Sequence, residues 1–561
     1  MRSILTTFAL AFLLALSASA QPKREIRSVW LTTNNGLDWP SSTFTINQKR
    51  SLTQMLDKLQ KAHFNTVLLQ VQCYGDVLWD SSYQPSMRVF TEDGSTNLTW
   101  DVSRFVIDEC HKRGMECHAW IVPYRIGSAA GAEYYAQNPR KHILLTHPEW
   151  TVLFNNQYYL DPGLPEVRSY LLDVYREMIE NYDFDGSNFD YTRYPGADFD
   201  DNASYARYGN NMDRGDWRRQ NINTFVHAFY DMAKEIKPGF KVGCAPIGTY
   251  KRAPGYSNME AYGVYQDPVE WVNAGKHDLV VPQLYWNEKY GFTPHMEMWA
   301  ELTSCSRHFV AGLAPYKMLD TNDWDVSVIT DQIEKARAAR GYYGACFFRT
   351  QHVIGPEERV KQLYTELSEN YYKYPANIPP MEFNGITRPN SPQNVNCTYA
   401  DGKYTLTWDA PEPDDEDTPI KYYCVYNAGQ TSDIENMENC VGHYITENSF
   451  TFSNGSENLS LAVTAFDVNY YESDPVIVIP TGIANSTFIA HALDITQERI
   501  SAEFESEIAT VKIVSTQGMT VASCLPGSNS FTLSIASLRK GVYLLTVKDV
   551  NGKTFTRKFV R

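Results

Sequence analysis

Eight short apolar segments recur between Glu25 and Tyr374, and helical patterns fill gaps between them. Strands that are buried on both faces and followed by helices are typical of a parallel sheet, because parallel strands need a long return connection. Eight such units fit a (β/α)₈ barrel with long loops. The expected strands begin near Ser28, Thr66, Glu116, Gly186, Lys241, Asp278, His308 and Gly344.

The connecting segments carry the spacing of amphipathic helices. Leu52, Met55, Leu56 and Leu59 recur at i, i+3, i+4 and i+7, which places them on one helical face. The competing fold is an open, doubly wound sheet, but no Gly-rich phosphate loop follows the first expected strand. We therefore predict the α/β class: a (β/α)₈ TIM barrel, followed by two small all-β sandwich domains.

The chain divides into five predicted parts by composition. Residues 1–20 combine a basic start, an apolar run and small residues before Gln21, which is the pattern of a signal peptide. The apolar run is too short for a stable bilayer anchor. The remaining parts are a barrel at 25–375, a Pro-rich linker at 376–391, a β-sandwich at 392–481 and a second β unit at 484–561.

The two β units each resemble a known module. Short alternating strands, an early Trp408 and the later strand 459–465 resemble a fibronectin type III module. The segment 540–561 predicts a hairpin around Asn551-Gly552 and resembles the C-terminal sorting domains of type IX secretion substrates. That resemblance implies contact with an export machinery; the alternative is an accessory sandwich that sorts nothing.

The charge and the cysteine spacing of the chain argue against several classes of partner and cofactor. The net charge is −16 and no basic cluster occurs, so we expect neither nucleic acid nor anionic lipid as a partner. We expect no transmembrane helix and an exported protein that is periplasmic, surface-bound or secreted. The cysteines lack zinc spacing; buried free thiols are favoured over disulfides, and we predict no metal or cofactor.

The segment 185–196, DGSNFDYTRYPG, holds the most informative pair of carboxylates. Asp190 falls where the fourth strand ends, and catalytic groups of a parallel barrel gather at the carboxyl ends of its strands. Asp185 comes before the strand, where we expect a turn or an ion pair at the opposite end. The alternative for Asp190 is a strand cap paired with Arg193.

Several expected strand ends together resemble the family-10-like glycosyl hydrolases, a bacterial barrel family distinct from the classical family-10 xylanases. The resemblance implies a polysaccharide-cleaving barrel over residues 25 to about 375, acting on the bacterial envelope and by extension on peptidoglycan glycan strands. The matching segments are RSVWLTT (27–33), QVQCYGDVLWDSSYQP (70–85), HAWIVPYR (118–125), LDPGLPEVR (160–168), DFDGSNFDYTRYP (183–195), DLVVPQLYW (278–286), GLAPYK (312–317) and GACFFR (344–349).

Two positions depart from known patterns. Gln72 stands where the resembled family usually carries an arginine, which removes a cation from the second strand. The fourth strand also resembles the chitinase signature, but the proton-donating glutamate of that signature would fall at Thr192. A threonine hydroxyl does not donate a proton at neutral pH, so the donor must come from another loop.

Glycoside cleavage needs a proton donor and a second carboxylate that attacks, activates water or stabilises the positive centre. Asp190 is our candidate for the second carboxylate, kept ionised by Arg193 or Tyr191. Asp76 follows the second strand and is either the acid or a turn residue. Glu288 follows the sixth strand and is either the acid or a solvated loop residue.

Aromatic and polar groups near the strand ends are the predicted sugar-binding residues. Aromatic rings stack on pyranose faces, and arginine, lysine and glutamine bind hydroxyls or an acidic substituent. For each tryptophan the alternative is core packing, and for His118 it is a hydrogen-bonded core histidine. The candidates are Trp30, His118, Arg125, Tyr191, Arg193, Gln283, Tyr285, Trp286, Lys317 and Arg349.

Together these features predict an exported glycoside hydrolase whose polysaccharide substrate binds at the carboxyl face of the barrel. The alternative is a non-catalytic carbohydrate-binding or surface scaffold protein on a degenerate barrel. The proton donor missing at position 192 keeps that alternative open.

Overall fold

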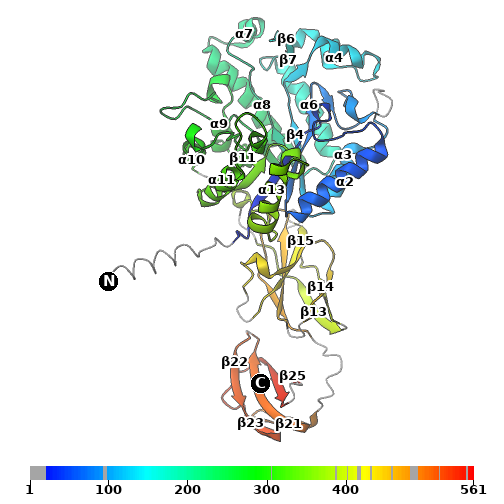
Figure 1. Ribbon diagram of the computed structural model, residues 1–561, viewed down its shortest axis with the longest axis vertical. Helices are drawn as coiled ribbons and strands as arrows, with labels where there is room; N and C mark the ends of the chain where they lie inside the picture. Colours follow the sequence, from blue (N-terminus) through cyan, green and yellow to red (C-terminus); the bar gives the residue numbers. More distant parts are fainter. Residues whose placement is uncertain are drawn as a thin grey trace, which may run out of the picture.

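The computed structural model supplies the three-dimensional description of the chain (Figure 1). It describes residues 21–91, 98–304, 306–385, 388–400, 402–412, 419–429, 433–455, 459–480, 490–516, 518–550 and 554–561. The predicted signal peptide at 1–20, the junction at 481–489 and the predicted Asn551-Gly552 turn lie outside these residues.

Eight parallel strands form a closed barrel, which confirms the predicted fold class. Each strand pairs in parallel with its two neighbours, and the pairing of β1 with β2 closes the ring. The strands are β1 (Ile26–Leu31), β2 (Thr66–Cys73), β4 (Glu116–Ile121), β8 (Gly186–Phe189), β9 (Lys241–Cys244), β10 (Leu279–Val280), β11 (His308–Leu313) and β12 (Tyr342–Phe347).

Helices surround the barrel because their apolar faces pack on the outward side chains of the strands (Figure 1). The predicted face of Leu52, Met55, Leu56 and Leu59 is buried in α2. The helices are α2 (Thr45–Lys61), α3 (Val102–His111), α4 (Ala129–Tyr134), α5 (Ile143–Thr146), α6 (Pro165–Asn181), α7 (Asn202–Tyr208), α8 (Arg214–Ile236), α9 (Pro268–Asn273), α10 (Phe292–Leu302), α11 (Val326–Ala338), α12 (Gln351–Ile354) and α13 (Glu358–Glu366).

Two small additions build up the carboxyl face of the barrel. The two-residue strand β3 (Asp76–Val77) folds back antiparallel on β2. A three-stranded sheet rises from the loop after β4 and consists of β5 (Arg125–Gly127), β6 (Thr151–Phe154) and β7 (Gln157–Leu160). Both additions place polar side chains beside the ends of the barrel strands.

The chain then forms two separate all-β units. Strands β13 (Gln393–Ala400), β14 (Lys403–Asp409) and β17 (Ser449–Ser453) form one sheet, and β15 (Ile420–Asn427), β16 (Cys440–Ile445), β18 (Leu461–Asp467) and β19 (Val476–Val478) form the facing one. The last unit contains β20 (Ala490–Ile495), β21 (Arg499–Ser515), β22 (Thr520–Cys524), β23 (Ser528–Ser534), β24 (Val542–Asp549) and β25 (Thr554–Val560). The resemblance of the first unit to a fibronectin type III module stays a prediction.

Several cysteines within the described ranges are thiols rather than members of disulfides. Cys117, Cys244 and Cys346 are buried in barrel strands, in agreement with the expectation of buried thiols. No helix of the described residues is both long and apolar enough to cross a bilayer.

The β-sandwich packs against the amino-terminal ends of the barrel strands, below the barrel in Figure 1. Lys421 of β15 donates to Asp185 at 2.8 Å, and Lys241 of β9 donates to Glu116 at 2.8 Å. The Tyr470 hydroxyl also donates to Glu116. Asp185 therefore lies in an ion pair at the bottom of the barrel, as the sequence predicted, and the site residues lie at the other end.

We expect Lys421→Met to destabilise the protein by about 3 kcal/mol, because it leaves Asp185 buried without its main counter-charge. Burial opposes ionisation, yet Lys421 and His111 hold the pKa of Asp185 well below its usual range. The stability that this carboxylate contributes is present at neutral pH and is lost as pH falls. Denaturation by urea at pH 7 and at about pH 2.5, which lies below the pKa of an unfolded aspartate, measures both effects.

Lys112→Met is the matched control, because Lys112 is exposed and contacts only Glu109, at 3.6 Å, among the ion pairs of the described residues. It should change the free energy of unfolding by less than about 1 kcal/mol. A Lys421→Met protein as stable as this control at pH 7 would show that the interface does not depend on the ion pair.

Candidate active site

Asp190 lies at the centre of the carboxyl face, directly after β8. Its side chain is 6% exposed and accepts three hydrogen bonds. The Tyr191 amide donates to Oδ1 at 2.8 Å, Gln283 Nε2 donates to Oδ1 at 3.2 Å, and Trp120 Nε1 donates to Oδ2 at 3.3 Å. The carboxylate is thus held from three different strand ends.

Burial raises the pKa of Asp190 to about 6, and the opposing influences of Arg193, Tyr191, Trp120 and Gln283 keep it from rising further. All the hydrogen-bond donors stabilise the ionised form. At neutral pH Asp190 is therefore a carboxylate, which suits a nucleophile, a general base or an electrostatic stabiliser.

Asp76 opens β3, close to the end of β2, and differs from Asp190 in its surroundings. Its carboxyl accepts a hydrogen bond from the Tyr135 hydroxyl. Burial raises the pKa of Asp76 to about 7, with the Tyr135 hydrogen bond acting against the rise, and no cation contributes. Asp76 therefore keeps its proton to higher pH than a free aspartate does, as a general acid must.

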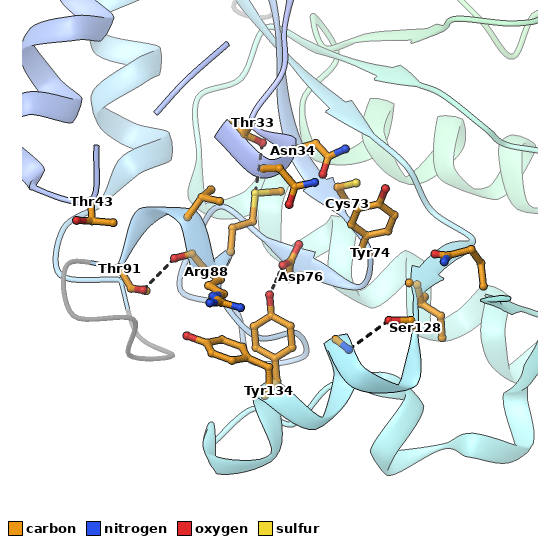
Figure 2. A pocket seen from close by; sticks show the side chains of 18 residues that line it. Thr33, Asn34, Thr43, Cys73, Tyr74, Asp76, Arg88, Thr91, Ser128 and Tyr134 are labelled. Atoms are coloured by element: carbon orange, nitrogen blue, oxygen red, sulfur yellow. Dashed lines mark hydrogen bonds between the residues drawn. The ribbon is translucent and has the colours of Figure 1, made fainter. Parts of the chain in front are cut away.

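A cavity of about 680 Å³ opens beside Asp76. Figure 2 shows Asp76 among the lining side chains, hydrogen-bonded to a tyrosine hydroxyl. Thr33, Asn34 and Ser128 supply further polar groups, and Tyr134 supplies an aromatic face. A cavity of this size with a few polar groups and an aromatic wall suits sugar rings.

The two carboxyl groups lie at the same mouth of the barrel. The charges of Asp76, Asp190 and Arg125 all act on the Cys73 thiol at the end of β2, where burial and the two aspartates raise its pKa. Burial raises the pKa of Tyr285, and the charge of Asp190 raises it further. Within the described parts of the chain, no group of three or more His, Cys, Asp or Glu side chains has a metal-binding arrangement.

Five of the predicted binding residues lie around Asp190 and the neighbouring Tyr191. Gln283 donates to it directly, and the Tyr285 hydroxyl beside it is buried with no partner in the described structure. Tyr191 is 44% exposed and has a left-handed backbone, with φ of 51°, which turns its ring out at the mouth. Arg193 stacks on this ring at 4.9 Å, and Arg125 is near it.

The predicted sugar-binding roles of two other residues are wrong, because both side chains are buried in the core. Trp30 is 1% exposed, donates to Asn188 at 3.1 Å and fills the barrel interior, so its ring has no face for a sugar. His118 is completely buried and bonds to Glu116, toward the bottom of the barrel. For both, the core alternative describes the structure.

Glu288 is a poor proton donor in this structure. It is exposed and forms an ion pair with Lys335 of α11. Partial burial opposes ionisation, but Lys335 and Thr293 lower the pKa of Glu288 below its usual value. A carboxylate that is ionised more readily than usual is unsuited to the role of acid, which corrects that prediction.

The remaining predicted binding residues have partners within the protein. Arg349 pairs with Asp38 at 2.5 Å, and Lys317 donates to the Tyr285 carbonyl at 2.6 Å. The Trp286 ring packs on His295, with 5.3 Å between centroids, and is partly buried. These three residues support the loops of the mouth, and their roles in sugar binding stay predictions.

Sequence reasoning missed Tyr135 and the function of Trp120. Tyr135 follows α4, far from any strand motif, so no pattern pointed to its bond with Asp76. Trp120 lies in the core of the barrel, and its indole N–H donates to Asp190. Gln72 has a structural role, since it bonds to Gln84 at 2.9 Å and to the Tyr175 hydroxyl at 2.7 Å.

Comparison with known proteins identifies two family matches. The family described as glycosyl hydrolase-like 10 matches residues 25–325, and the secretion system C-terminal sorting domain matches residues 496–561. The chain is 31% identical over 438 residues to glycosyl hydrolase YngK of Bacillus subtilis strain 168, covering 73% of this chain and 84% of that protein.

One further curated protein and one solved structure are similar to the chain. The chain is 29% identical over 388 residues to glycosyl hydrolase DigH of Escherichia coli strain K12, covering 62% of this chain and 88% of that protein. The solved structure of the PgaB (BpsB) glycoside hydrolase domain from Bordetella bronchiseptica is 15% identical, with a TM-score of 0.44, covering 62% of this chain and 99% of that domain.

Proposed function

Because the chain belongs to the glycosyl hydrolase-like 10 family, we propose that it is an exported glycoside hydrolase that cleaves a polysaccharide at the carboxyl face of its barrel. The observation that carries this proposal is a pair of buried carboxyl groups at one mouth of the barrel, of which Asp190 has a neighbouring cation, Arg193, and Asp76 has none among the groups that shift its pKa. Glycan strands of peptidoglycan are the first substrate to test. The matched sorting domain supports export.

In the proposed reaction the Asp76 carboxyl gives its proton to the leaving glycosidic oxygen. The Asp190 carboxylate acts on the opposite side, where it stabilises or attacks the positive sugar centre or activates water. Tyr135 holds the Asp76 side chain, and Trp120 and Gln283 hold Asp190. Asp76 thus supplies the donor that Thr192 does not.

The test is to incubate the protein with peptidoglycan sacculi, stem-peptide-free glycan strands and chitin oligomers, and to measure new reducing ends. The proposal expects product from at least one polymer, and no product with Asp190→Asn. Binding without product, in the wild type and the variant alike, would contradict hydrolysis and support the alternative of a carbohydrate-binding protein.

We expect Trp120→Phe to shift the acid limb of the pH profile upward. The change keeps an aromatic ring but removes the indole N–H that stabilises the Asp190 carboxylate. The pKa of Asp190 then rises, so activity at pH 5 falls by up to about tenfold while activity near pH 7 changes little. An equal loss at both pH values would indicate a distorted site instead.

A further inference from the structure

Two cysteine thiols lie in contact between a helix and a strand of the barrel wall. Cys110 lies in the last turn of α3, on the face of this helix that is buried against the barrel. Cys117 of β4 points outward to the layer between strands and helices, because side chains alternate along a strand and Trp120 points into the barrel. The two side chains form a hydrogen bond, and both are completely buried.

A tight turn keeps the two cysteines close. The Met115 amide donates to the Cys110 carbonyl at 3.0 Å, and Gly114 has a left-handed backbone with φ of 71°. The chain therefore reverses direction between the end of α3 and the start of β4. A disulfide needs two Cα atoms within about 7 Å of each other, and a reversal of this kind holds the two elements together.

The backbone around these cysteines also carries the ion pair on which the β-sandwich docks. The Cys117 amide and His111 Nε2 each lie 2.8 Å from Asp185 Oδ2, and Lys421 of the sandwich donates to Oδ1 at 2.8 Å. His111 directly follows Cys110. A covalent bond between the two cysteines would therefore tie together the two barrel groups that hold Asp185.

We propose that Cys110 and Cys117, which are thiols in this structure, form a disulfide when the chain is exported. The inference goes beyond the proposed hydrolysis and does not depend on it; it depends on export, which the matched sorting domain supports. The two thiols lose two protons and two electrons as the S–S bond forms. The oxidant is another disulfide, of a protein or a small molecule, which takes up both and becomes two thiols.

The bond forms while the barrel folds. Burial raises the pKa of Cys117, and the hydrogen bond to Cys110 raises it further. The folded protein therefore holds little of the thiolate that attacks a disulfide. The same burial keeps reductants away from the finished bond.

A second pair of contacting thiols is the matched control. Cys424 of β15 hydrogen-bonds to Cys440 of β16, but Cys440 lies opposite Tyr426 in the sheet, so Cys424 is its diagonal neighbour. The Cα atoms of diagonal neighbours lie about 7–8 Å apart, beyond the usual reach of a disulfide. We expect Cys424 and Cys440 to remain thiols.

Peptide mapping of the full chain tests the proposal. The wild type is exported to the periplasm of an expression host, denatured in iodoacetamide without reductant and digested with trypsin. Trypsin cuts after Lys112 and Arg113 and so separates the two cysteines. The peptides 105–112 and 114–125 should be joined and should separate on reduction, whereas Cys424 and Cys440 should be alkylated. Alkylation of both Cys110 and Cys117 overturns the proposal.

Thermal unfolding gives a second readout. Wild type refolded from urea with a reductant should unfold about 5 °C below the oxidised protein, because the bond restricts the unfolded chain. Cys110→Ala lacks the bond and should have one midpoint in both conditions. A reductant that lowers the midpoint of Cys110→Ala as much as that of the wild type overturns a stabilising bond at this place.

Discussion

Asp190→Asn should reduce glycan cleavage by about a thousandfold or more. Asparagine nearly preserves the shape of the side chain and its place near Trp120 and Gln283, but it carries no negative charge. A neutral amide neither stabilises a positive sugar centre nor attacks it, nor does it take a proton from water. The loss should appear in kcat, since the substrate still binds. Release of reducing ends from glycan strands measures it.

Asp198→Asn is the matched control, because Asp198 is exposed in the loop after the same strand. Its activity should equal that of the wild type. If Asp190→Asn kept more than about a tenth of the wild-type rate, Asp190 would not be the essential carboxylate. Circular dichroism and thermal unfolding of both variants exclude loss of the fold as the cause.

Asp76→Asn should reduce cleavage of natural glycans by about a hundredfold and change the pH profile. The wild type needs Asp190 ionised and Asp76 protonated, so activity should rise through about pH 6 and fall through about pH 7. The fall in activity on the alkaline side of the pH profile reflects the loss of the Asp76 proton. Asp76→Asn therefore removes this fall, and the acid limb of Asp190 remains.

The leaving group provides a second readout for Asp76. An aryl glycoside whose phenolate leaves without protonation should be cleaved by Asp76→Asn at close to the wild-type rate. Asp80→Asn, an exposed residue four positions further along, is the control and should behave as the wild type on every substrate. An equal loss on natural and aryl substrates would mean that Asp76 is not the proton donor.

Much of the barrel was predictable because its signals are local. Each expected strand began within about two residues of an observed one, since a strand buried on both faces must be an apolar run. The end of β8 likewise put Asp190 at the carboxyl face, because all strands of a closed parallel barrel run the same way. The family and the sorting domain followed from the same strand-end and hairpin motifs and are confirmed.

The charge states of the site were not predictable in the same way. Asp76 and Glu288 both follow strand ends, and nothing local separates them. The structure separates them by their neighbours. Burial raises the pKa of Asp76, which bonds to Tyr135 from a segment about sixty residues later. Glu288 instead pairs with Lys335 of α11, which favours its ionised form. Trp30 and Trp286 were both predicted to bind sugar, but Trp30 lies within β1 and is 1% exposed, whereas Trp286 follows β10 and is only partly buried.

The sequence by itself determined the order of strands, the face at which Asp190 lies and the structural part of Asp185, because periodicity and chain direction are local properties. Only the tertiary structure decided that burial raises the pKa of Asp76 whereas Lys335 lowers that of Glu288, and that the sandwich closes the other end of the barrel through Lys421. Those outcomes depend on burial and on charges brought together from distant segments. A proton's affinity is set by these surroundings, which no single stretch of sequence contains.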